Sequence, residues 1–309
     1  PFKALQMGSV WRADRPQRGR FRQFTQCDID ILGDATNLAE IEEILALTKA
    51  LKRICPDKAY TVRVNDRAIL KGMADYSGFP ENETDKVFII LDKMDKIGLD
   101  GVREELLAEG YAPEAVEKYT GLLAEIQNDA AGVRALGEKL SGVMDPAKAE
   151  NLAAIMETVK AVADIEFGLE FDPTLVRGMG YYTGTIFEVS MEGFGGSVAG
   201  GGRYDKLIGK FTGVDTPACG FSIGFERIIT ILMDSGFKVP EAAGKKAFLY
   251  EKGLSGEQFR AVLKKAQEER ANGTRVAVAQ MNKNKKFQKE QLAKDGYEEI
   301  VEFYKDSLK

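Results

Sequence analysis

Apolar and polar residues alternate near the start of the chain, and residues 10–33 are predicted to form two strands joined by a charged loop. At a side-chain period of two, one face of the second strand carries Arg20, Arg22, Phe24, Gln26, Asp28 and Asp30. This face changes from cations, through an aromatic ring, to an amide and then to carboxylates. Phe24 and Asp30 lie roughly 20 Å apart at about 3.3 Å per residue, the size of a nucleotide joined to a small cation. Taken singly, these residues also fit a solvated strand face, but their order by charge favours a ligand site.

Helical periodicity follows this strand. Asn37 can cap a helix with Glu40 as its capping-box partner, and apolar residues then recur at helical spacing. Residues 60–64 alternate as a strand, and a second helix is expected to begin between Asp66 and Gly72. Residues from about 76 to 168 are rich in Glu, Lys, Leu and Ala and show no strand pattern, which indicates a helical insertion.

The rest of the chain returns to strand patterns. A strand is predicted at residues 181–189, followed by a glycine-rich segment at 193–205, a strand at 218–224 and an apolar helix at 225–234. After a Pro/Gly linker near 240–244, strands and helices alternate to the end of the sequence. This alternation predicts a small, largely parallel α/β domain.

Composition indicates an ordinary globular protein. The chain has 309 residues, long enough for two or three domains with their own cores. No apolar run approaches the ~20 residues needed to span a bilayer, and no signal-peptide pattern opens the sequence. Three widely spaced cysteines fit neither a disulfide framework nor a zinc site. We therefore expect a cytoplasmic protein with no membrane partner.

Charge and the absence of one residue type restrict the chemistry. The net charge of −5 argues against a surface that coats nucleic acid, although the first 33 residues carry six Lys/Arg against three Asp. This local excess of positive charge suits a ligand that bears phosphate. The sequence contains no histidine, which excludes Ser-His-Asp and Cys-His catalysis and imidazole metal ligands. Chemistry driven by positioning and charge stabilisation, such as phosphoryl or nucleotidyl transfer, is favoured.

Two arginines and the glycine-rich segment are further candidates. The segment 193–205 matches neither a Walker A loop nor a dinucleotide fingerprint. It fits close backbone approach to a ligand and a flexible hairpin loop about equally. Arg177 precedes a predicted strand with two tyrosines, where a lone arginine is more often structural. Arg227 opens an apolar helix, where a cation opposes the helix dipole and so invites a functional explanation.

Four segments resemble a known family. The segment VWRADRPQRGRFRQFTQCDIDILG is similar to motif 2 of class II aminoacyl-tRNA synthetases, and GFSIGFERIITIL to their motif 3. LVRGMGYYTGTIFEV and GGRYD resemble the two histidine-binding segments of the histidyl-tRNA synthetases. The four occur in the family's order over residues 1–236, and together they are far more specific than any one of them.

The resemblance implies an α+β fold, in which an antiparallel sheet flanked by helices carries the site. It divides the chain into a catalytic core in two parts (residues 1–75 and 169–237), a helical insertion (76–168) and a C-terminal α/β domain (245–309). The last is expected to be a shortened anticodon-binding domain. Its basic run at 283–289 could touch RNA, but a solvated helix face is favoured. Motif 1 and the loop that holds the substrate amino group are expected upstream.

The implied reaction is that of a histidine–tRNA ligase. Histidine is activated with ATP to histidyl-adenylate and passed to the 3′ end of tRNA(His). Mg²⁺ accompanies ATP, the protein holds no metal of its own, and the full-length protein is expected to be a homodimer. No protein nucleophile is needed, because charge builds on phosphate oxygens that guanidinium forks bind bidentately.

The resemblance also assigns residues to ATP. Arg12 would hold the α-phosphate, and Asp14 would help to read ATP. Arg20 would bind the outer phosphates, while Phe24 stacks on adenine. Arg227 would clamp the γ-phosphate from the other side.

A second set is assigned to histidine. Gln26 and Asp30 would contact the substrate, and Tyr182 and Tyr204 would reach its imidazole ring. Arg177 would lie beside the α-phosphate as a fixed cation. Two positions depart from the family: Gly180 stands where Asp is frequent, and Thr25 where His or Tyr is frequent. Asp30 is also shorter than the Glu common at its position.

Two alternatives remain open. A non-catalytic paralogue could act as the regulatory subunit of ATP phosphoribosyltransferase in histidine biosynthesis. The presence of Arg12, Arg20, Arg177 and Arg227 and of a further domain favours the enzyme. A synthetase for another amino acid is the second alternative, and the two histidine-binding segments speak against it.

Overall fold

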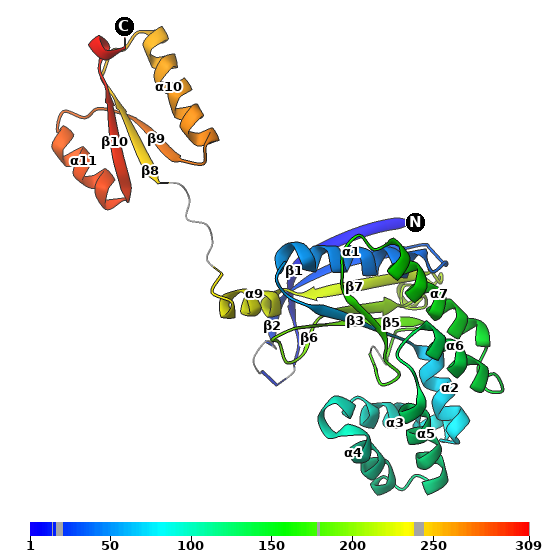
Figure 1. The fold of residues 1–309 in the computed structure, drawn as a ribbon. Coiled ribbons are helices and arrows are strands. Elements are labelled where there is room, and N and C mark those ends of the chain that lie inside the picture. Colours follow the sequence, from blue (N-terminus) through cyan, green and yellow to red (C-terminus); the bar gives the residue numbers. More distant parts are fainter. Residues whose placement is uncertain (14, 17–20, 178–179, 238–243, 309) are drawn as a thin grey trace. The chain divides into compact units, whose positions relative to one another are not determined.

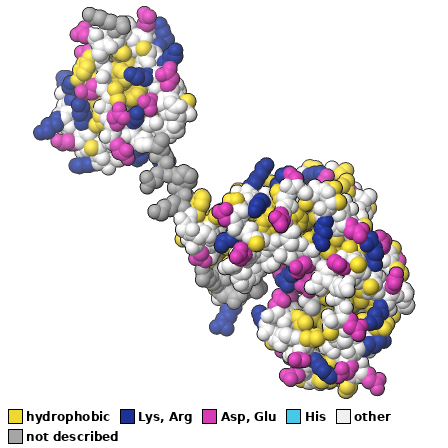
Figure 2. Space-filling model, viewed as in Figure 1, with side chains coloured by type: hydrophobic (Ala, Val, Ile, Leu, Met, Phe, Trp, Pro, Cys, Tyr) yellow, Lys and Arg dark blue, Asp and Glu magenta, His cyan; other side chains and the backbone are white. Residues whose placement is uncertain are grey.

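The computed structural model describes residues 1–309 except 14, 17–20, 178–179, 238–243 and 309. The chain divides into two compact units, residues 1–235 and 236–309 (Figure 1). Lys/Arg and Asp/Glu side chains are interspersed over the visible face of each unit (Figure 2), which agrees with a net charge of only −5. Within the described part of the chain, every helix is too short or too polar to cross a bilayer.

The first unit is built on a seven-stranded sheet. Its strands are β1 (Phe2–Trp11), β2 (Gln23–Leu32), β3 (Tyr60–Asp66), β4 (Gly168–Phe171), β5 (Thr185–Met191), β6 (Ser197–Arg203) and β7 (Ala218–Gly224), in the order β1-β2-β7-β6-β5-β3-β4. All neighbours are antiparallel except β3 and β4, which pair in parallel. The predicted α+β fold with a sheet flanked by helices is confirmed. The strand predicted to start at residue 181 begins at Thr185, because the preceding tyrosines lie outside the ladder.

Helices fill the intervals between the strands. They are α1 (Leu38–Ile54), α2 (Arg67–Ser77), α3 (Thr84–Leu91), α4 (Met94–Ala108), α5 (Pro113–Glu125), α6 (Ala130–Lys139), α7 (Pro146–Val162), α8 (Gly209–Thr212) and α9 (Phe225–Asp234), with a 3-10 turn at Glu81–Glu83. Residues 67–162 are therefore helical apart from short connections, as the sequence predicted from about residue 76 onward. The axis of α4 is interrupted at Gly98, which has φ 68°. Asp66 begins α2 as expected, since its carboxylate accepts a hydrogen bond from the Ala68 amide.

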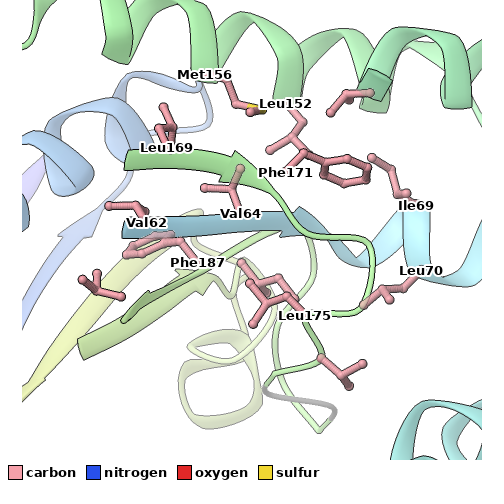
Figure 3. Close-up of a cluster of buried hydrophobic side chains, with 14 of the residues drawn as sticks. Val62, Val64, Ile69, Leu70, Leu152, Met156, Leu169, Phe171, Leu175 and Phe187 are labelled. Atoms are coloured by element: carbon pink, nitrogen blue, oxygen red, sulfur yellow. The ribbon is translucent and has the colours of Figure 1, made fainter. Parts of the chain in front are cut away.

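The core lies on the face of the sheet that α1 and α7 cover. Val62 and Val64 of β3, together with Phe187 of β5, point from this face toward Leu152 and Met156 of α7 (Figure 3), and all five side chains are buried. Because strand side chains alternate, Arg63 and Glu188 point to the opposite face. One face of the sheet is thus packed and the other is left for polar side chains.

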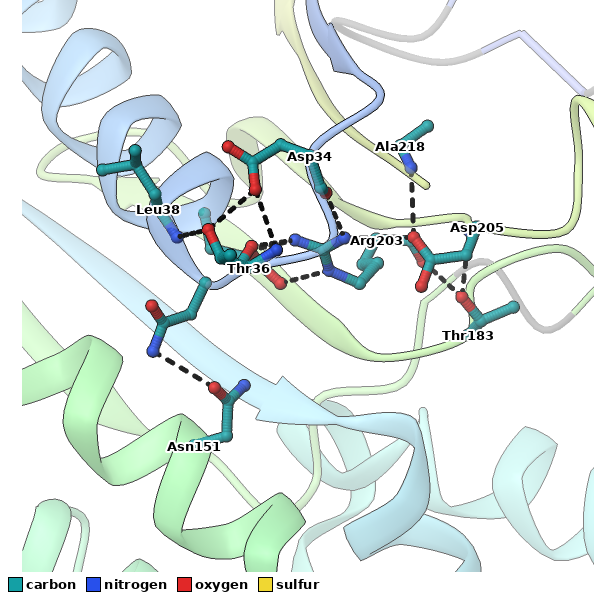
Figure 4. Close-up of polar contacts among 10 residues, drawn as sticks. Asp34, Thr36, Leu38, Asn151, Thr183, Arg203, Asp205 and Ala218 are labelled. Carbon is teal, nitrogen blue, oxygen red and sulfur yellow. Dashed lines mark hydrogen bonds and ion pairs between the residues drawn. The ribbon is translucent and has the colours of Figure 1, made fainter. Parts of the chain in front are cut away.

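One arginine lies on the packed face. Arg203 of β6 donates to both carboxylate oxygens of Glu40 in α1, at 2.6 and 2.5 Å. Its remaining N–H groups donate to the backbone oxygens of Asp34 and Thr36 and to the carboxylate of Asp205 (Figure 4). All five guanidinium donors are thus used, and they fasten α1 to the sheet.

The capping box predicted at the start of α1 is wrong. Asn37 makes no capping hydrogen bond; its amide instead donates to Asn151 of α7, at 3.1 Å. The Glu40 carboxylate is held by Arg203 and so cannot reach back to the first turn. The amide of Leu38 is satisfied by the hydroxyl of Thr36, at 3.3 Å.

The second unit is a small α/β layer. It contains β8 (Lys245–Tyr250), α10 (Gly256–Ala271), β9 (Arg275–Gln280), α11 (Lys285–Lys294), β10 (Tyr297–Phe303) and a 3-10 turn at Lys305–Ser307. The three strands are parallel, as the alternating pattern predicted, and lie in the order β10-β8-β9. A separate core forms around Phe248, Val262 and Phe303. The basic run predicted as a solvated helix face falls on α11, which has no buried residue.

Candidate functional site

A cleft of about 240 Å³ opens on the polar face of the large sheet. Its lining comes from the connection between β1 and β2, from β2, β6 and β7, from the start of α9 and from the segment before β5. The residues that line it are Arg12, Phe21, Phe24, Gln26, Arg177, Tyr181, Tyr182, Ser197, Val198, Ala199, Gly200, Ser222, Gly224, Glu226 and Arg227. The volume suits a small molecule rather than a polymer, and the lining combines cations with aromatic rings.

At one end of the cleft, a cation lies on an aromatic ring. The guanidinium carbon of Arg12 is 4.2 Å from the centre of the Phe24 ring, within the range of a cation–π contact. Arg12 also donates from Nε to the carbonyl oxygen of Phe21, at 3.0 Å. These contacts fix the arginine beside an aromatic surface on which a flat base could stack.

The first turn of α9 supplies two charged side chains. Arg227 donates to the carbonyl oxygen of Ser197 and, at 3.0 Å, to its hydroxyl, so that β6 orients the guanidinium toward the cleft. Glu226 accepts a hydrogen bond from the backbone amide of Thr25 at 2.6 Å and ties α9 to β2. The acid in the first turn offsets the unfavourable placement of Arg227 against the helix dipole.

Arg177 lies across the middle of the sheet. A Cβ atom added to Gly200 would lie 1.7 Å from its Nη1 atom, so the guanidinium rests directly on bare backbone of β6. The same Nη1 is 2.9 Å from a carboxylate oxygen of Glu188 in β5. The glycine is therefore required for this cation to sit at the floor of the cleft.

The glycine-rich segment is a central strand, which neither of the two sequence interpretations anticipated. Gly200, Gly201 and Gly202 are buried in β6. A Cβ at Gly201 would lie 2.0 Å from the carbonyl oxygen of Gly220, and one at Gly202 would lie 2.6 Å from that of Thr185. The close approach that favoured glycine thus involves neighbouring strands at Gly201 and Gly202, and the Arg177 side chain at Gly200.

Carboxylates and tyrosines gather beyond the cleft floor. The Tyr204 hydroxyl donates to Asp30, and Gln26 donates from its side-chain amide to Asp28 at 2.8 Å. Burial raises the pKa of Asp30, and the hydrogen bond from Tyr204 opposes that shift. Burial also raises the pKa of Tyr182, so its hydroxyl remains a proton donor at neutral pH. This arrangement can accept hydrogen bonds from a cationic or N–H-bearing ring.

The structure gathers most of the residues that the sequence assigned to the site. Arg12, Phe24, Gln26, Arg177, Tyr182 and Arg227 line the same cleft. Asp30 and Tyr204 are bonded to each other but are not among the described residues that line this cleft. The Tyr204 ring contacts that of Tyr181, which does line it, with 6.4 Å between the ring centres. Asp14 and Arg20 lie outside the described residues. Their roles stay predictions, as do those of the other site residues.

The sequence did not single out several lining residues. Glu226 and Tyr181 each adjoin a residue that was chosen, but neither has a motif of its own. Ser197 and Ser222 lie in segments where a single hydroxyl carries no signal. At Gly180 an added Cβ would meet no atom within 4 Å, so this departure from the family removes a side chain where there is room for one.

Comparisons with known proteins find similar sequences in one family. The sequence profile described as "Histidyl-tRNA synthetase" matches residues 1–228. A histidine–tRNA ligase from Leifsonia xyli is 47% identical over 249 residues, which cover 79% of this chain and 56% of that protein. One from Korarchaeum cryptofilum is 34% identical over 303 residues, which cover 97% of this chain and 68% of that protein. The chain thus spans little more than half the length of the Leifsonia relative.

Solved structures show the same fold. Histidyl-tRNA synthetase from Nostoc sp. PCC 7120 superposes with a TM-score of 0.75 at 26% identity, covering 96% of this chain and 69% of that one. A Bacillus halodurans structure titled as an ATP phosphoribosyltransferase regulatory subunit/histidyl-tRNA synthetase superposes with a TM-score of 0.68 at 22% identity. The match covers 98% of this chain and 74% of that one. The profile match and the sequence identities show that the chain belongs to the histidyl-tRNA synthetase family.

Proposed function

We propose that this chain carries the adenylate-forming site of a histidine–tRNA ligase. The observation that supports this most directly is one cleft lined by Arg12, Arg177 and Arg227 together with Phe24. Three guanidinium groups and an aromatic ring in one cleft suit a nucleoside triphosphate better than an uncharged ligand.

The order of side chains supports a separate place for each substrate. Adenine stacks on Phe24, and Arg12 and Arg227 bind phosphate oxygens at that end. Histidine lies toward Gln26 and Asp30, where Tyr204 and Tyr182 add polar contacts. Its carboxylate then attacks the α-phosphorus, pyrophosphate leaves, and Arg177 stabilises the charge that builds on the equatorial oxygens.

Mg²⁺ would arrive with ATP and neutralise charge on its phosphates. Carboxylate oxygens are the ligands that Mg²⁺ prefers, and Glu226 is the carboxylate among the described lining residues. One of its oxygens accepts from the Thr25 amide, and a carboxylate can accept several bonds, so Glu226 fits this role. Transfer to tRNA(His), a homodimeric full-length protein and a cytoplasmic location complete the proposal.

Histidine-dependent ATP–pyrophosphate exchange tests the proposal on the full-length protein that the gene encodes. The wild-type protein should exchange, and Arg177→Ala should lose roughly 100- to 1,000-fold of that rate, because it removes a preorganised charge at the reacting phosphate. Histidine affinity, measured by calorimetry, should change little. A large loss of histidine binding in Arg177→Ala would mean that the role given to this arginine is wrong.

The regulatory paralogue is the second candidate, supported by the fold likeness to the Bacillus halodurans structure. It predicts that the wild-type protein binds histidine but shows no exchange. Exchange that depends on an amino acid other than histidine would refute both candidates.

A further inference from the structure

We infer that Glu188 is a positioning residue, held by Arg63, that keeps the Arg177 guanidinium at the floor of the cleft. This inference rests on the proposed function, because it concerns the cation assigned to the reacting phosphate. The carboxylate lies between the two arginines and contacts each with a different oxygen.

The first support is a single row across the sheet. Arg63 of β3 lies opposite Glu188 of β5, which lies opposite Gly200 of β6, and Gly200 lies opposite Ser222 of β7. Residues in one row point to the same face, which here is the face of the cleft. Gly200 leaves a gap in the row, and Arg177 occupies it.

The second support is the pairing of Glu188. One oxygen accepts from Arg63 Nη2 at 2.9 Å, and the other lies 2.9 Å from Arg177 Nη1. The Glu188 side chain is only 16% exposed, and those of Arg63 and Arg177 are 22% and 30% exposed. Pairs this sheltered from water are screened less by salt than surface pairs, so their geometry is held more firmly.

The third support is that Arg63 is itself fixed. Its Nη1 atom is bonded to Asp172 at 3.0 Å and to Asp95 of α4 at 3.1 Å. These two bonds hold Arg63 in place, and Arg63 in turn restrains the Glu188 carboxylate. A carboxylate bonded on one side to a fixed arginine is a rigid anchor for the arginine on its other side.

Rigidity matters because Arg177 precedes β5 and belongs to no helix or strand. A cation that stabilises a reacting phosphate must be held near its productive position before the reaction, since reorganisation costs rate. Glu188 and the bare backbone of Gly200 supply that restraint from two sides.

The test is a double-mutant cycle in the exchange assay. Glu188→Gln keeps the shape but removes the charge, and should lower kcat by about 10- to 100-fold while the KM for histidine changes less than about threefold. In the Arg177→Ala background it should cause no further loss, because the two residues act as one unit. Glu170→Gln is the matched control, since Glu170 lies opposite Arg63 on its other side and is exposed.

Should Glu188→Gln not fold, Glu188→Asp keeps the charge and shortens the side chain by one carbon. Glu188→Asp should lower kcat less than Glu188→Gln does, and in the Arg177→Ala background it should cause no further loss of kcat. An equal loss in both backgrounds, or an unchanged kcat in Glu188→Gln, would overturn the inference.

A second readout does not depend on activity. In protein labelled with ¹⁵N-arginine, the restrained guanidinium of Arg177 should show separate, slowly exchanging Nη signals that merge in Glu188→Gln. Merged signals in the wild-type protein would refute the restraint. If the wild-type protein shows no ATP–pyrophosphate exchange, the proposed function fails, and the NMR measurement still decides the role of Glu188. If the wild-type protein and Glu188→Gln are equally active, the inference about Glu188 fails and the proposed function stands.

Discussion

The two faces of the large sheet each hold an arginine paired with an acidic side chain, and the two arginines are used differently. Arg203 lies on the packed face, and its side chain is 10% exposed with all five N–H donors bonded. Arg177 lies on the polar face, is 30% exposed, and lines a cleft. An arginine whose donors are all bonded within the protein can only stabilise the fold, whereas one that faces a cleft can bind a ligand.

This difference is not visible in the local sequence. Both arginines lie in segments that resemble histidine-binding motifs, and both are next to glycine. What separates them is the set of partners that the fold supplies. Substitutions on the packed face should therefore change the free energy of unfolding, and those on the open face should change ligand binding.

The largest effect is expected from Arg203→Ala. The change leaves the Glu40 carboxylate, which is 1% exposed, without its cation, and should lower the free energy of unfolding by about 3–5 kcal/mol. Urea denaturation measures it, with the exposed neighbour Lys206→Ala as control. A loss of less than about 1 kcal/mol in the free energy of unfolding, as is usual for surface substitutions, would contradict a structural role for Arg203.

The next effect belongs to the open face. Asp30→Ala removes the acceptor for Tyr204 at the proposed histidine end and should weaken histidine binding by about 10- to 100-fold, as expected for a lost bond to a charged group. Calorimetric titration with histidine measures it, and ATP binding serves as the internal control. Unchanged histidine affinity would count against the pocket proposed here.

A pH dependence should come from the packed face. Burial raises the pKa of Glu43 from its usual 4.5 to about 8, and the carboxylates of Asp30 and Glu40 add to the shift. The folded state therefore binds a proton that the unfolded state has released, so this contribution to stability is complete below pH 4.5 and is lost as pH rises to about 8. The slope should reach about 1.4 kcal/mol per pH unit between those limits. Denaturation of Glu43→Gln across this range should show a flatter profile, and an unchanged slope would contradict the assignment.

The smallest effect is expected at Asp95 of α4, the exposed partner of Arg63. Asp95 is 70% exposed, so Asp95→Asn should change the free energy of unfolding by less than about 1 kcal/mol. Exchange activity should stay within about threefold of wild type, because Asp172 still holds Arg63. A larger loss of activity than in Glu188→Gln would place the restraint on α4 rather than on the sheet.

Much of the fold could be predicted because its signals are local. Alternation marked β2 and β3, an apolar periodic run marked α9, and alternating elements marked the second unit. The capping box at Asn37 failed because Glu40 has a partner 163 positions away, which no local pattern contains. Glu226 and Glu188 were missed for the same reason, since their importance comes from Thr25 and Arg177 on other elements.

The glycine run in β6 has a consequence for how variants of this chain would be interpreted. At Gly200, Gly201 and Gly202 any Cβ would come within 3 Å of another atom, so almost every substitution should be deleterious. In a library of random variants these three positions would stand out as strongly as the arginines of the cleft, although they contribute no functional group. Intolerance at Gly201 and Gly202 would report the close approach of the neighbouring strands, and intolerance at Gly200 the space that Arg177 occupies. A screen by activity alone would mistake these steric requirements for chemistry.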